Sequence, residues 1–488
     1  MKLQYPFKEV HMFNLRFDNS YLKLSDDFYE ISQPDKPAQP EVVIFNTKLA
    51  EQLNIDSSIQ DHPEYLSGKE ILPGSMPSAH AYAGHQFGHF TLLGDGRAHV
   101  LGEHLTEDNK RYDIQLKGSG RTIFSRSGDG RAAIGPMLRE YIISEAMYQL
   151  NIPTTRSLAV SLTGGNVYRE TSLPGAVLVR IAQSNLRVGT FEYAVRTENK
   201  DNIKQLADYA ISRHYPEIKH DHNPYLSLLN IVIEKQASLI AKWQSIGFIH
   251  GVMNTDNMTI SGETIDYGPC AFMDTYHPST VFSSIDQYGR YAYDNQPSIA
   301  LWNLTRFAET LIPLIDDDEA LAIQNAETAL GKFQDLYVSH YMKHFGQKIG
   351  VENIQQQDFQ LVIDLLALLE KYECDFTKTF RSLATNTFKE EVCFKHDDVQ
   401  AWYKRWEDII QQDETYDAFT LMQSVNPSVI PRNHLVEDAL SDATLAQDYT
   451  KLQQLLEALS HPFDDYHDAQ YLSPAPPTDR VYQTYCGT

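Results

Sequence analysis

The chain has 488 residues, of which 42% are hydrophobic and 11% aromatic, a composition typical of a globular protein with about two or three structural units. Its 65 acidic and 41 basic residues give a formal net charge of -24, which argues against non-specific binding to nucleic acid, because such binding needs clustered lysines and arginines. A phosphate site must therefore be a local basic pocket within an acidic protein.

The cysteines, the beginning of the chain and the hydropathy pattern predict a cytoplasmic protein. The four cysteines form no CxxC pair, which excludes a zinc ribbon and a thioredoxin-type motif, and such sparse use suits a reducing compartment, although one disulfide is compatible with it. Residues 1–7 lack the apolar core of a signal peptide, and no segment approaches the roughly 18 apolar residues of a membrane helix. We therefore expect neither a membrane nor nucleic acid as a partner.

Glycine becomes dense after residue 79, in the segments 83–88 and 93–98. Glycine lets a backbone turn tightly and approach a ligand closely. The pattern Gly94-x-Gly96, followed by Arg97, is by itself a weak indication of a loop over phosphates, because such turns are common.

A strictly alternating segment at residues 112–117 predicts a strand. Its apolar residues (Tyr112, Ile114, Leu116) face one way and its polar residues (Asp113, Gln115, Lys117) face the other. A lysine at the end of such a strand is usually a solvated surface residue, so Lys117 becomes functionally interesting only if a carboxylate lies beside it.

Residues 136–150 predict a helix whose apolar side chains surround it almost completely, so we expect it to be largely buried. Glu140 shares a face with apolar residues, and a buried carboxylate is costly unless it is paired. We therefore expect Glu140 to pair with Lys117, as a strand lysine and a helix glutamate do in protein kinases. The alternative is a surface pair of Glu140 with Arg139 or Arg131.

Two arginines follow this helix. Residues 175–181 predict a buried strand that carries Arg180, and Arg187 follows shortly after it. Guanidinium groups bind phosphate oxygens bidentately, so both arginines are candidates for a phosphate clamp. The alternative for each is an acidic partner within the protein.

A loop that ends in an Asp-Asn pair is followed, after a predicted hairpin at residues 258–265, by Asp-Tyr-Gly. Protein kinases have a catalytic loop ending in Asn, a short hairpin and an Asp-Phe-Gly whose Asp binds magnesium. Asn257 and Asp266 are therefore candidate metal ligands. The catalytic Asp of a kinase would stand at Val252, so the loop belongs either to a dead kinase or to a site of different phosphate chemistry.

The second half of the chain predicts mainly helices. They cover residues 225–246, 297–315, 317–345, 359–372 and 399–411. Strands before and helices after, with the candidate residues at the join, predict an α+β fold that is bilobal and protein-kinase-like. We expect an N-terminal extension (1–75), a strand-rich N-lobe (76–190), a helical C-lobe with the catalytic and metal-binding loops (191–430) and a C-terminal tail (431–488).

Five segments are together far more specific than any single motif. They are residues 93–98 (LGDGRA), 115–120 (QLKGSG), 129–131 (DGR), 250–258 (HGVMNTDNM) and 266–269 (DYGP). In these segments the chain resembles the selenoprotein O family, the YdiU-type protein adenylyltransferases, which are kinase-fold pseudokinases. The resemblance extends over nearly the whole chain.

The resemblance implies that ATP binds in a flipped orientation and that AMP, with release of pyrophosphate, is transferred to a protein hydroxyl; UMP transfer from UTP is a variant. It implies nucleotide contacts by Gly94, Gly96, Arg97, Lys117, Asp129, Gly130, Arg180, Arg187 and Asp266, with Glu140 supporting Lys117. It implies Mg2+ or Mn2+ on Asn257 and Asp266, and Asp256 as proton acceptor.

A flipped nucleotide also accounts for Val252, because attack at the α-phosphate moves the reacting centre and lets a base elsewhere on the loop act. Asp256 lies beside Asn257, where a carboxylate either accepts the hydroxyl proton or helps to neutralise the metal, and both roles stay open. Two other functions also stay open: a kinase that transfers the γ-phosphate, and a non-catalytic nucleotide-binding scaffold.

The cysteines depart from the pattern of the family. Some bacterial members pair a C-terminal cysteine with one in the segment after Asp-Tyr-Gly, about where this chain has Phe282. The chain keeps Cys486 but lacks that partner, so we do not expect a redox switch by that route. Cys270 is an alternative partner, and an unpaired thiol at Cys486 is the expectation.

Overall fold

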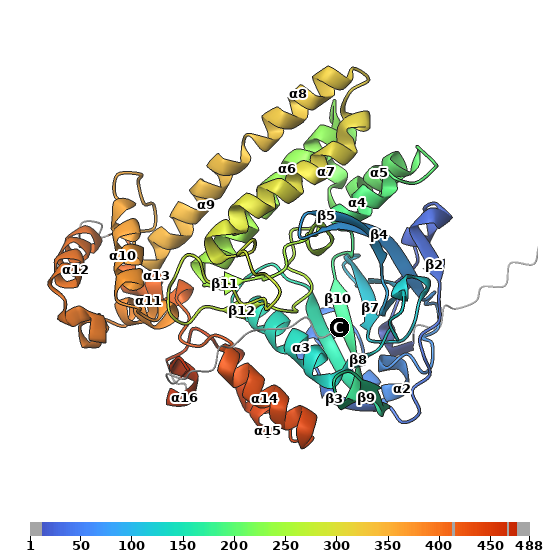
Figure 1. Cartoon of the computed structure of the whole chain (residues 1–488), viewed down its shortest axis with the longest axis horizontal. Helices are drawn as coiled ribbons and strands as arrows, with labels where there is room; N and C mark the ends of the chain where they lie inside the picture. The colour runs from blue at the N-terminus through green and yellow to red at the C-terminus, as the bar shows by residue number, and fades with distance from the viewer. Residues whose placement is uncertain (1–11, 412–414, 466–467, 476–488) are drawn as a thin grey trace, which may run out of the picture.

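A computed structural model describes residues 12–411, 415–465 and 468–475. It combines one large antiparallel sheet, formed by strands up to Ala182, with a second part that consists mainly of helices (Figure 1). The α+β class predicted from the sequence is therefore confirmed.

The sheet has ten strands in the order β2-β4-β6-β7-β10-β9-β3, with β1 paired to β6, β5 to β4 and β8 to β10. The strands are β1 (Phe17–Asp18), β2 (Tyr29–Ile31), β3 (Glu41–Phe45), β4 (Ser78–Gln86), β5 (His89–Gly94), β6 (Ala98–Leu105), β7 (Arg111–Lys117), β8 (Ala132–Ala133), β9 (Arg156–Tyr168) and β10 (Ser172–Ala182). The first 75 residues thus supply three strands of the sheet.

Both faces of the sheet are covered. Ile114 and Leu116 pack on one face beneath α1 (Thr47–Gln52) and α2 (Pro63–Leu66). The opposite face packs against α3 (Ile134–Gln149), which is buried along most of its length, as predicted. Because neither face is open to water, the polar residues of β7 are buried as well, and each of them needs a partner.

The helical part follows the sheet. Its elements are α4 (Val188–Ala194), α5 (Asn202–His214), α6 (Pro224–Ser245), β11 (Phe248–Ile249), β12 (Ala271–Phe272), α7 (Gln296–Ile315), α8 (Glu319–Leu330), α9 (Phe333–Lys348), α10 (Gln360–Lys371), α11 (Phe376–Ala384), α12 (Asp397–Ile410), α13 (Ala418–Val425), α14 (Asn433–Leu445), α15 (Thr450–Leu459) and α16 (Ala469–Leu472). In Figure 1, α6 to α9 lie side by side as a long bundle, and α14 packs against α3.

The predicted hairpin at residues 258–265 is wrong. Its two halves pair with other segments instead: Thr259 forms an isolated bridge with Arg187, and Thr264 forms one with Thr154. Two-residue to three-residue strands gain little from pairing with each other, whereas each half here finds backbone partners in the first part of the chain. The loop before Asp266 is thereby fixed to the end of the sheet.

The single helix predicted for residues 317–345 is also wrong, because the chain forms two helices there. The helix α8 ends at Leu330, and α9 begins at Phe333 after Gly331 and Lys332. Glycine has the lowest helix propensity after proline, so it is a natural break in an otherwise helical pattern. Among the helices described, none is long and apolar enough to cross a membrane.

Lys348, at the end of α9, is buried, and the pH dependence of its protonation tests how tightly the helical part is packed. Its ammonium group is buried over the rings of Phe380, at 4.3 Å, and Phe376, at 5.3 Å, and burial lowers its pKa to about 7. Between pH 7 and the ordinary lysine value, the unfolded chain binds a proton that the folded chain does not. We therefore expect the free energy of unfolding to rise with pH in this window, by up to about 1.4 kcal/mol per unit.

The Lys348→Met variant checks this prediction by urea unfolding across that pH range. Since methionine carries no titratable group, the variant should be more stable than the native protein near pH 7, and the difference should shrink as pH rises. If the difference in unfolding free energy between the variant and the native protein does not change with pH, the prediction that folded Lys348 is neutral above pH 7 is wrong.

Candidate active site

Lys117 ends β7, where its ammonium group meets two carboxylates. Its Nζ lies 2.6 Å from Oε2 of Glu140 on α3 and 2.8 Å from Oδ1 of Asp266. Arg180 on β10 reaches the same two groups, with Nη2 2.6 Å from Glu140 Oε1 and 2.6 Å from Asp266 Oδ1. The register of β7 and β10 places Gln115 opposite Arg180, and Gln115 Oε1 accepts a hydrogen bond from Arg180 Nη1 at 3.1 Å.

The alternative surface pair of Glu140 with Arg139 or Arg131 is excluded by this geometry. Arg139 faces away from the sheet and donates to Glu437 of α14 at 2.6 Å. Arg131 pairs with Asp35 at 2.8 Å. Neighbouring helix positions differ by about 100° in direction, so Glu140 points to the sheet while Arg139 points to α14.

Both carboxylates of this network are held in the ionised form. Burial alone would raise the pKa of Glu140, but Arg180 and Lys117 outweigh burial and lower it. The same two cations, together with Arg187, hold the pKa of Asp266 well below its usual range against the effect of burial. Asp266 also has a left-handed backbone with a φ of 62°, a conformation that aspartate tolerates better than most residues.

Arg187 is the third cation and the least engaged. Its Nη2 lies 3.9 Å from Asp266 Oδ2, and its guanidinium lies over the ring of Tyr82 at 4.5 Å. Within the part of the chain that the structure describes, its buried Nε has no hydrogen-bond partner. Because an unsatisfied buried donor is costly, this atom is suited to an anionic ligand in the adjoining cavity.

A cavity of about 200 Å³ collects most of the predicted site residues. Those that line it are Gly96, Arg97, Lys117, Arg180, Arg187, Asp256, Asn257 and Asp266. Glu140 lies behind Lys117 and does not line the cavity. Pockets that enclose a whole drug-sized ligand have volumes of roughly 300–1,000 Å³. This cavity is smaller, and four cations (Arg97, Lys117, Arg180 and Arg187) line it beside the carboxylates of Asp95, Asp256 and Asp266. Such a set suits the phosphates of a nucleotide together with a metal ion.

Three predicted nucleotide contacts do not line this cavity. Gly94 packs so closely on Phe124 that an added Cβ would lie 2.2 Å from the ring. Asp129 pairs with Arg169 at 3.0 Å, and Gly130, with a φ of +70°, bonds through its carbonyl to the amide of Gly120. Gly94 belongs to a glycine-rich turn, and Asp129 and Gly130 belong to the loop 121–130, which packs against that turn.

The strand β4 also lines the site, a contribution that is not predicted from the sequence. Gln86 Nε2 donates to both carboxylate oxygens of Asp256, at 2.9 Å and 3.1 Å. The amide of His85 donates to Thr255 Oγ1 at 2.7 Å. The spacing of Tyr82, Gly84 and Gln86 at every second position is typical of a strand, but the dense glycines of the same segment are more typical of a turn.

Gly84 is required by the close approach of Asp256. A Cβ added at Gly84 would lie 2.2 Å from Oδ1 of Asp256. Phe87, in the turn that follows β4, donates through its amide to Asn254 Oδ1 at 3.0 Å. The end of β4 and the turn after it thus hold residues 254–256 in place.

Asp256 itself lies at the inner wall of the cavity, almost fully buried. Burial raises its pKa to about 7, although Arg187 and the amide of Gln86 favour the ionised form. A carboxylate with a pKa near neutrality is well matched to accepting a proton from a hydroxyl group at physiological pH.

The oxygen donors around Asp266 fit a hard divalent cation. Asn257 Nδ2 donates to the carbonyl of Val252 at 3.0 Å, which leaves its Oδ1 as the free acceptor of the amide. Oδ2 of Asp266 lies 3.9 Å from Arg187 Nη2, whereas the short contacts of Lys117 and Arg180 are to Oδ1. Asn257 and Asp266 line one cavity, and Mg2+ in phosphate-transfer sites is typically bound by one or two such groups together with substrate phosphates.

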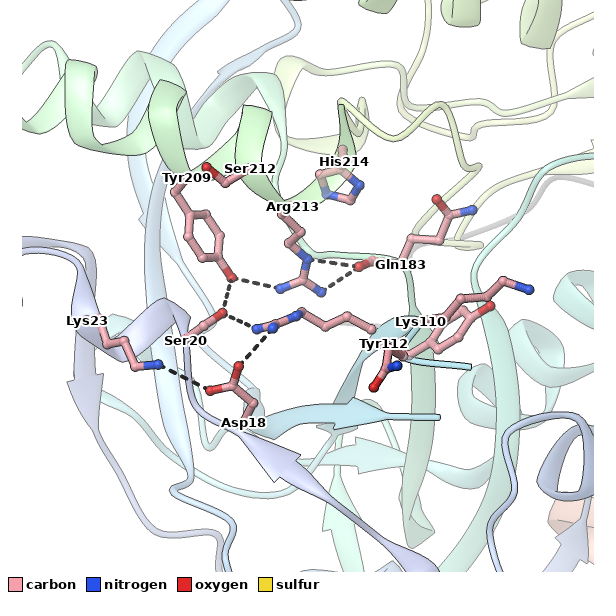
Figure 2. Close-up of a pocket in the computed structure, with 12 residues that line it drawn as sticks. Asp18, Ser20, Lys23, Lys110, Tyr112, Gln183, Tyr209, Ser212, Arg213 and His214 are labelled. Carbon is pink, nitrogen blue, oxygen red and sulfur yellow. Dashed lines mark hydrogen bonds and ion pairs between the residues drawn. The ribbon is translucent and has the colours of Figure 1, made fainter. Parts of the chain in front are cut away.

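A second cavity, of about 750 Å³, lies between α5 on one side and β1 and the start of β7 on the other (Figure 2). The cations that line it are paired with carboxylates: Arg111 with Asp18, Arg213 with Asp113, Lys23 with Asp18 and Lys110 with Asp108. Figure 2 shows Arg213 also reaching Gln183 and Tyr209, so its donors are already engaged. In the smaller cavity the cations are paired as well, but the buried Nε of Arg187 has no hydrogen-bond partner among the described residues, so the smaller cavity is the better phosphate site.

Two sequence predictions concern residues that the structure does not describe. Cys486 and residues 1–7 lie outside the described residues. Cys270, the alternative cysteine partner, is fully buried after the Asp-Tyr-Gly segment, and its carbonyl accepts a hydrogen bond from Arg139 at 2.7 Å.

Comparison with known proteins gives the family of the chain. The family model for protein adenylyltransferase SelO matches residues 11–460. Proteins named protein nucleotidyltransferase YdiU are 52% identical over 478 residues in Bacillus cytotoxicus, covering 97% of each chain, and 52% identical over 487 residues in Alkaliphilus metalliredigens, covering 99% of each. A third, from Syntrophotalea carbinolica, is 51% identical over 478 residues and covers 97% of each chain. The chain therefore belongs to the SelO family of protein adenylyltransferases.

Proposed function

We propose that the protein transfers AMP from ATP to hydroxyl side chains of other proteins and releases pyrophosphate. The observation that carries this proposal is the convergence of Lys117, Arg180 and Arg187 on one cavity that also contains Asp256. Three cations suit a triphosphate, and a near-neutral carboxylate beside them suits activation of a hydroxyl. Membership of the SelO family supports the same reaction.

In the proposed reaction, the target hydroxyl loses its proton to a carboxylate oxygen of Asp256. The hydroxyl oxygen forms a bond to the α-phosphorus of ATP, and the bond from that phosphorus to the bridging oxygen of pyrophosphate breaks. Lys117, Arg180 and Arg187 stabilise the negative charge that develops on the phosphoryl oxygens and on the leaving group. Mg2+ or Mn2+, held by Asn257 and Asp266, would supply further positive charge there.

Two loops of the first part of the chain would hold the nucleotide in the proposed reaction. Gly94, Gly96 and Arg97 would cover the phosphates, and the loop with Asp129 and Gly130 would contact the rest of a nucleotide bound in the flipped orientation. The sheet and the helical part would act as the two lobes of a protein-kinase-like architecture, with residues 76–190 and 191–430 as the lobes and residues 1–75 and 431–488 as extensions. The expected location is the cytoplasm, where both ATP and target proteins would be accessible to the enzyme.

Analysis of the released product tests the reaction type. With ATP, a divalent cation and a cell extract as the source of targets, we expect pyrophosphate to be released in step with adenylylation of protein. A parallel reaction with UTP determines whether UMP is also transferred. Release of ADP together with phosphorylated protein would show a kinase, and absence of any covalent product would show a nucleotide-binding scaffold.

A further inference from the structure

Three arginines gather on aromatic rings beside the active-site cavity. The guanidinium carbons of Arg290 and Arg306 lie 5.0 Å and 5.1 Å from the ring centre of Trp302, and that of Arg196 lies 5.1 Å from the ring centre of Phe90. We call these five residues the arginine shelf. They come from the segment just after α4, the loop before α7, α7 itself and β5, so only the fold brings them together.

The shelf adjoins the mouth of the cavity. A Cβ added at Gly88, two residues after Gln86, would lie 3.7 Å from the guanidinium carbon of Arg290. The next residue, Tyr291, donates its hydroxyl to Asn254 Oδ1 at 2.6 Å. Because Gln86 and Asn254 both line the cavity, Arg290 lies at its rim.

The ring of His85 connects the two aromatic parts of the shelf. Its centre lies 5.4 Å from the ring centre of Phe90 and 5.2 Å from that of Trp302. The same residue bonds through its amide to Thr255, immediately before Asp256. The shelf therefore continues from the catalytic loop to the surface.

The charge of the shelf is only partly neutralised within the protein. Arg306 pairs with Glu309 at 2.7 Å, whereas Arg196 and Arg290 have no ion-pair partner among the described residues. Two further carboxylates lie close to the shelf, and both are engaged by other groups. Asp286 accepts hydrogen bonds from the backbone amides of Arg290 and Tyr291, at 2.9 Å and 2.8 Å, and Glu192 is bonded to Thr255 and to the ring of His85. An arginine such as Arg290, which lies at the rim of the cavity without an ion-pair partner among the described residues, is available to an external anion.

We propose that the arginine shelf binds acidic side chains that flank the modified hydroxyl of the target protein. This inference rests on the proposed function, because it assigns the target segment of that same reaction. An acidic flank gains charge-assisted hydrogen bonds from guanidinium groups that stacking holds in place. The exposed side chains of Ile285 and Tyr288, on the same loop as Arg290, offer apolar contact to the rest of the segment.

A pair of synthetic peptides tests the inference with the full-length protein and ATP labelled in the α-phosphate. Each peptide carries Ser, Thr and Tyr at its centre, flanked by glutamates in one peptide and by lysines in the other. We expect the glutamate peptide to be labelled with a kcat/KM at least about tenfold higher, mainly through a lower KM, and the difference to shrink at high salt.

Charge reversal at the shelf provides the sharper comparison. Arg196 is exposed, so Arg196→Glu should fold normally, and we expect it to raise KM for the glutamate peptide by roughly threefold to fivefold while lowering KM for the lysine peptide. Arg290→Lys keeps the charge and should retain the preference, whereas Arg290→Ala should weaken it. The matched control is Arg405→Glu, which changes an exposed arginine of α12 that pairs with Asp364.

Three results would overturn the inference: equal labelling of both peptides, a preference for the lysine peptide, or a preference that Arg196→Glu leaves unchanged. A self-associated form of the protein that Arg196→Glu dissociates would show that a second copy occupies the shelf, and would also overturn it. Labelling of the enzyme itself is recorded in every reaction. Failure of α-label transfer to any protein, including the enzyme, would instead refute the proposed function.

Discussion

The Asp256→Asn variant is expected to lose roughly 10²–10⁴-fold in kcat for AMP transfer, because asparagine cannot accept the hydroxyl proton. The substitution keeps the size of the side chain and leaves an amide oxygen for the hydrogen bond from Gln86. Since a neutral amide avoids the cost of burying a carboxylate, the melting temperature should be unchanged or higher. Initial rates of label transfer, together with thermal unfolding of the same preparation, check both parts.

This variant also separates the two roles that the sequence leaves open for Asp256. A proton acceptor predicts lost kcat with unchanged affinity for nucleotide and for Mg2+. If kcat recovers at high Mg2+ concentration, Asp256 belongs to the metal shell and the proposed role as a base is wrong. Asp266→Asn serves as the comparison, since loss of this candidate ligand should weaken binding of the metal-nucleotide complex.

The Gly84→Ala variant is expected to lower kcat by about 10²-fold without contact to any substrate. The added methyl group would lie 2.2 Å from Asp256 Oδ1, so the carboxylate must move, and a displacement of about 1 Å at a reacting group has an effect of this size. The measurement is kcat for AMP transfer beside nucleotide affinity, which should change little because the phosphate-binding cations are not displaced.

Gly165→Ala is the matched control for this prediction. Gly165 has no positive φ, and an added Cβ would meet its nearest neighbour, Thr163 Oγ1, at 3.9 Å, which is ordinary contact. The control should therefore keep full activity. A Gly84→Ala enzyme as active as the control would show that β4 does not position Asp256.

The pairing of Lys117 with Glu140 could be predicted from the sequence because each half has a local signal. Strict alternation places Lys117 at the end of a strand. A carboxylate on the buried face of an apolar helix is costly unless it is paired. Arg180 could be named as a candidate, but its contact with the same carboxylates depends on the register of β7 and β10, which no local pattern gives.

The contribution of β4 to the site could not be predicted in the same way. Gln86 and Asp256 are 170 residues apart, and they are in contact only because the fold places the end of β4 against the loop at residues 250–257. The hairpin before Asp266 was predicted wrongly for a related reason, since its halves pair with Arg187 and Thr154 rather than with each other. Long-range contacts decide the outcome at both places: side-chain hydrogen bonds at Gln86 and backbone bridges at Thr259 and Thr264.

The measurement that tests the central claim most directly compares ATP labelled in the α-phosphate with ATP labelled in the γ-phosphate, using the native enzyme and the Asp256→Asn variant as a blank. We predict that protein acquires only the α-label, and that the variant transfers almost none. Transfer of only the γ-label by the native enzyme would contradict the account and would identify the protein as a kinase.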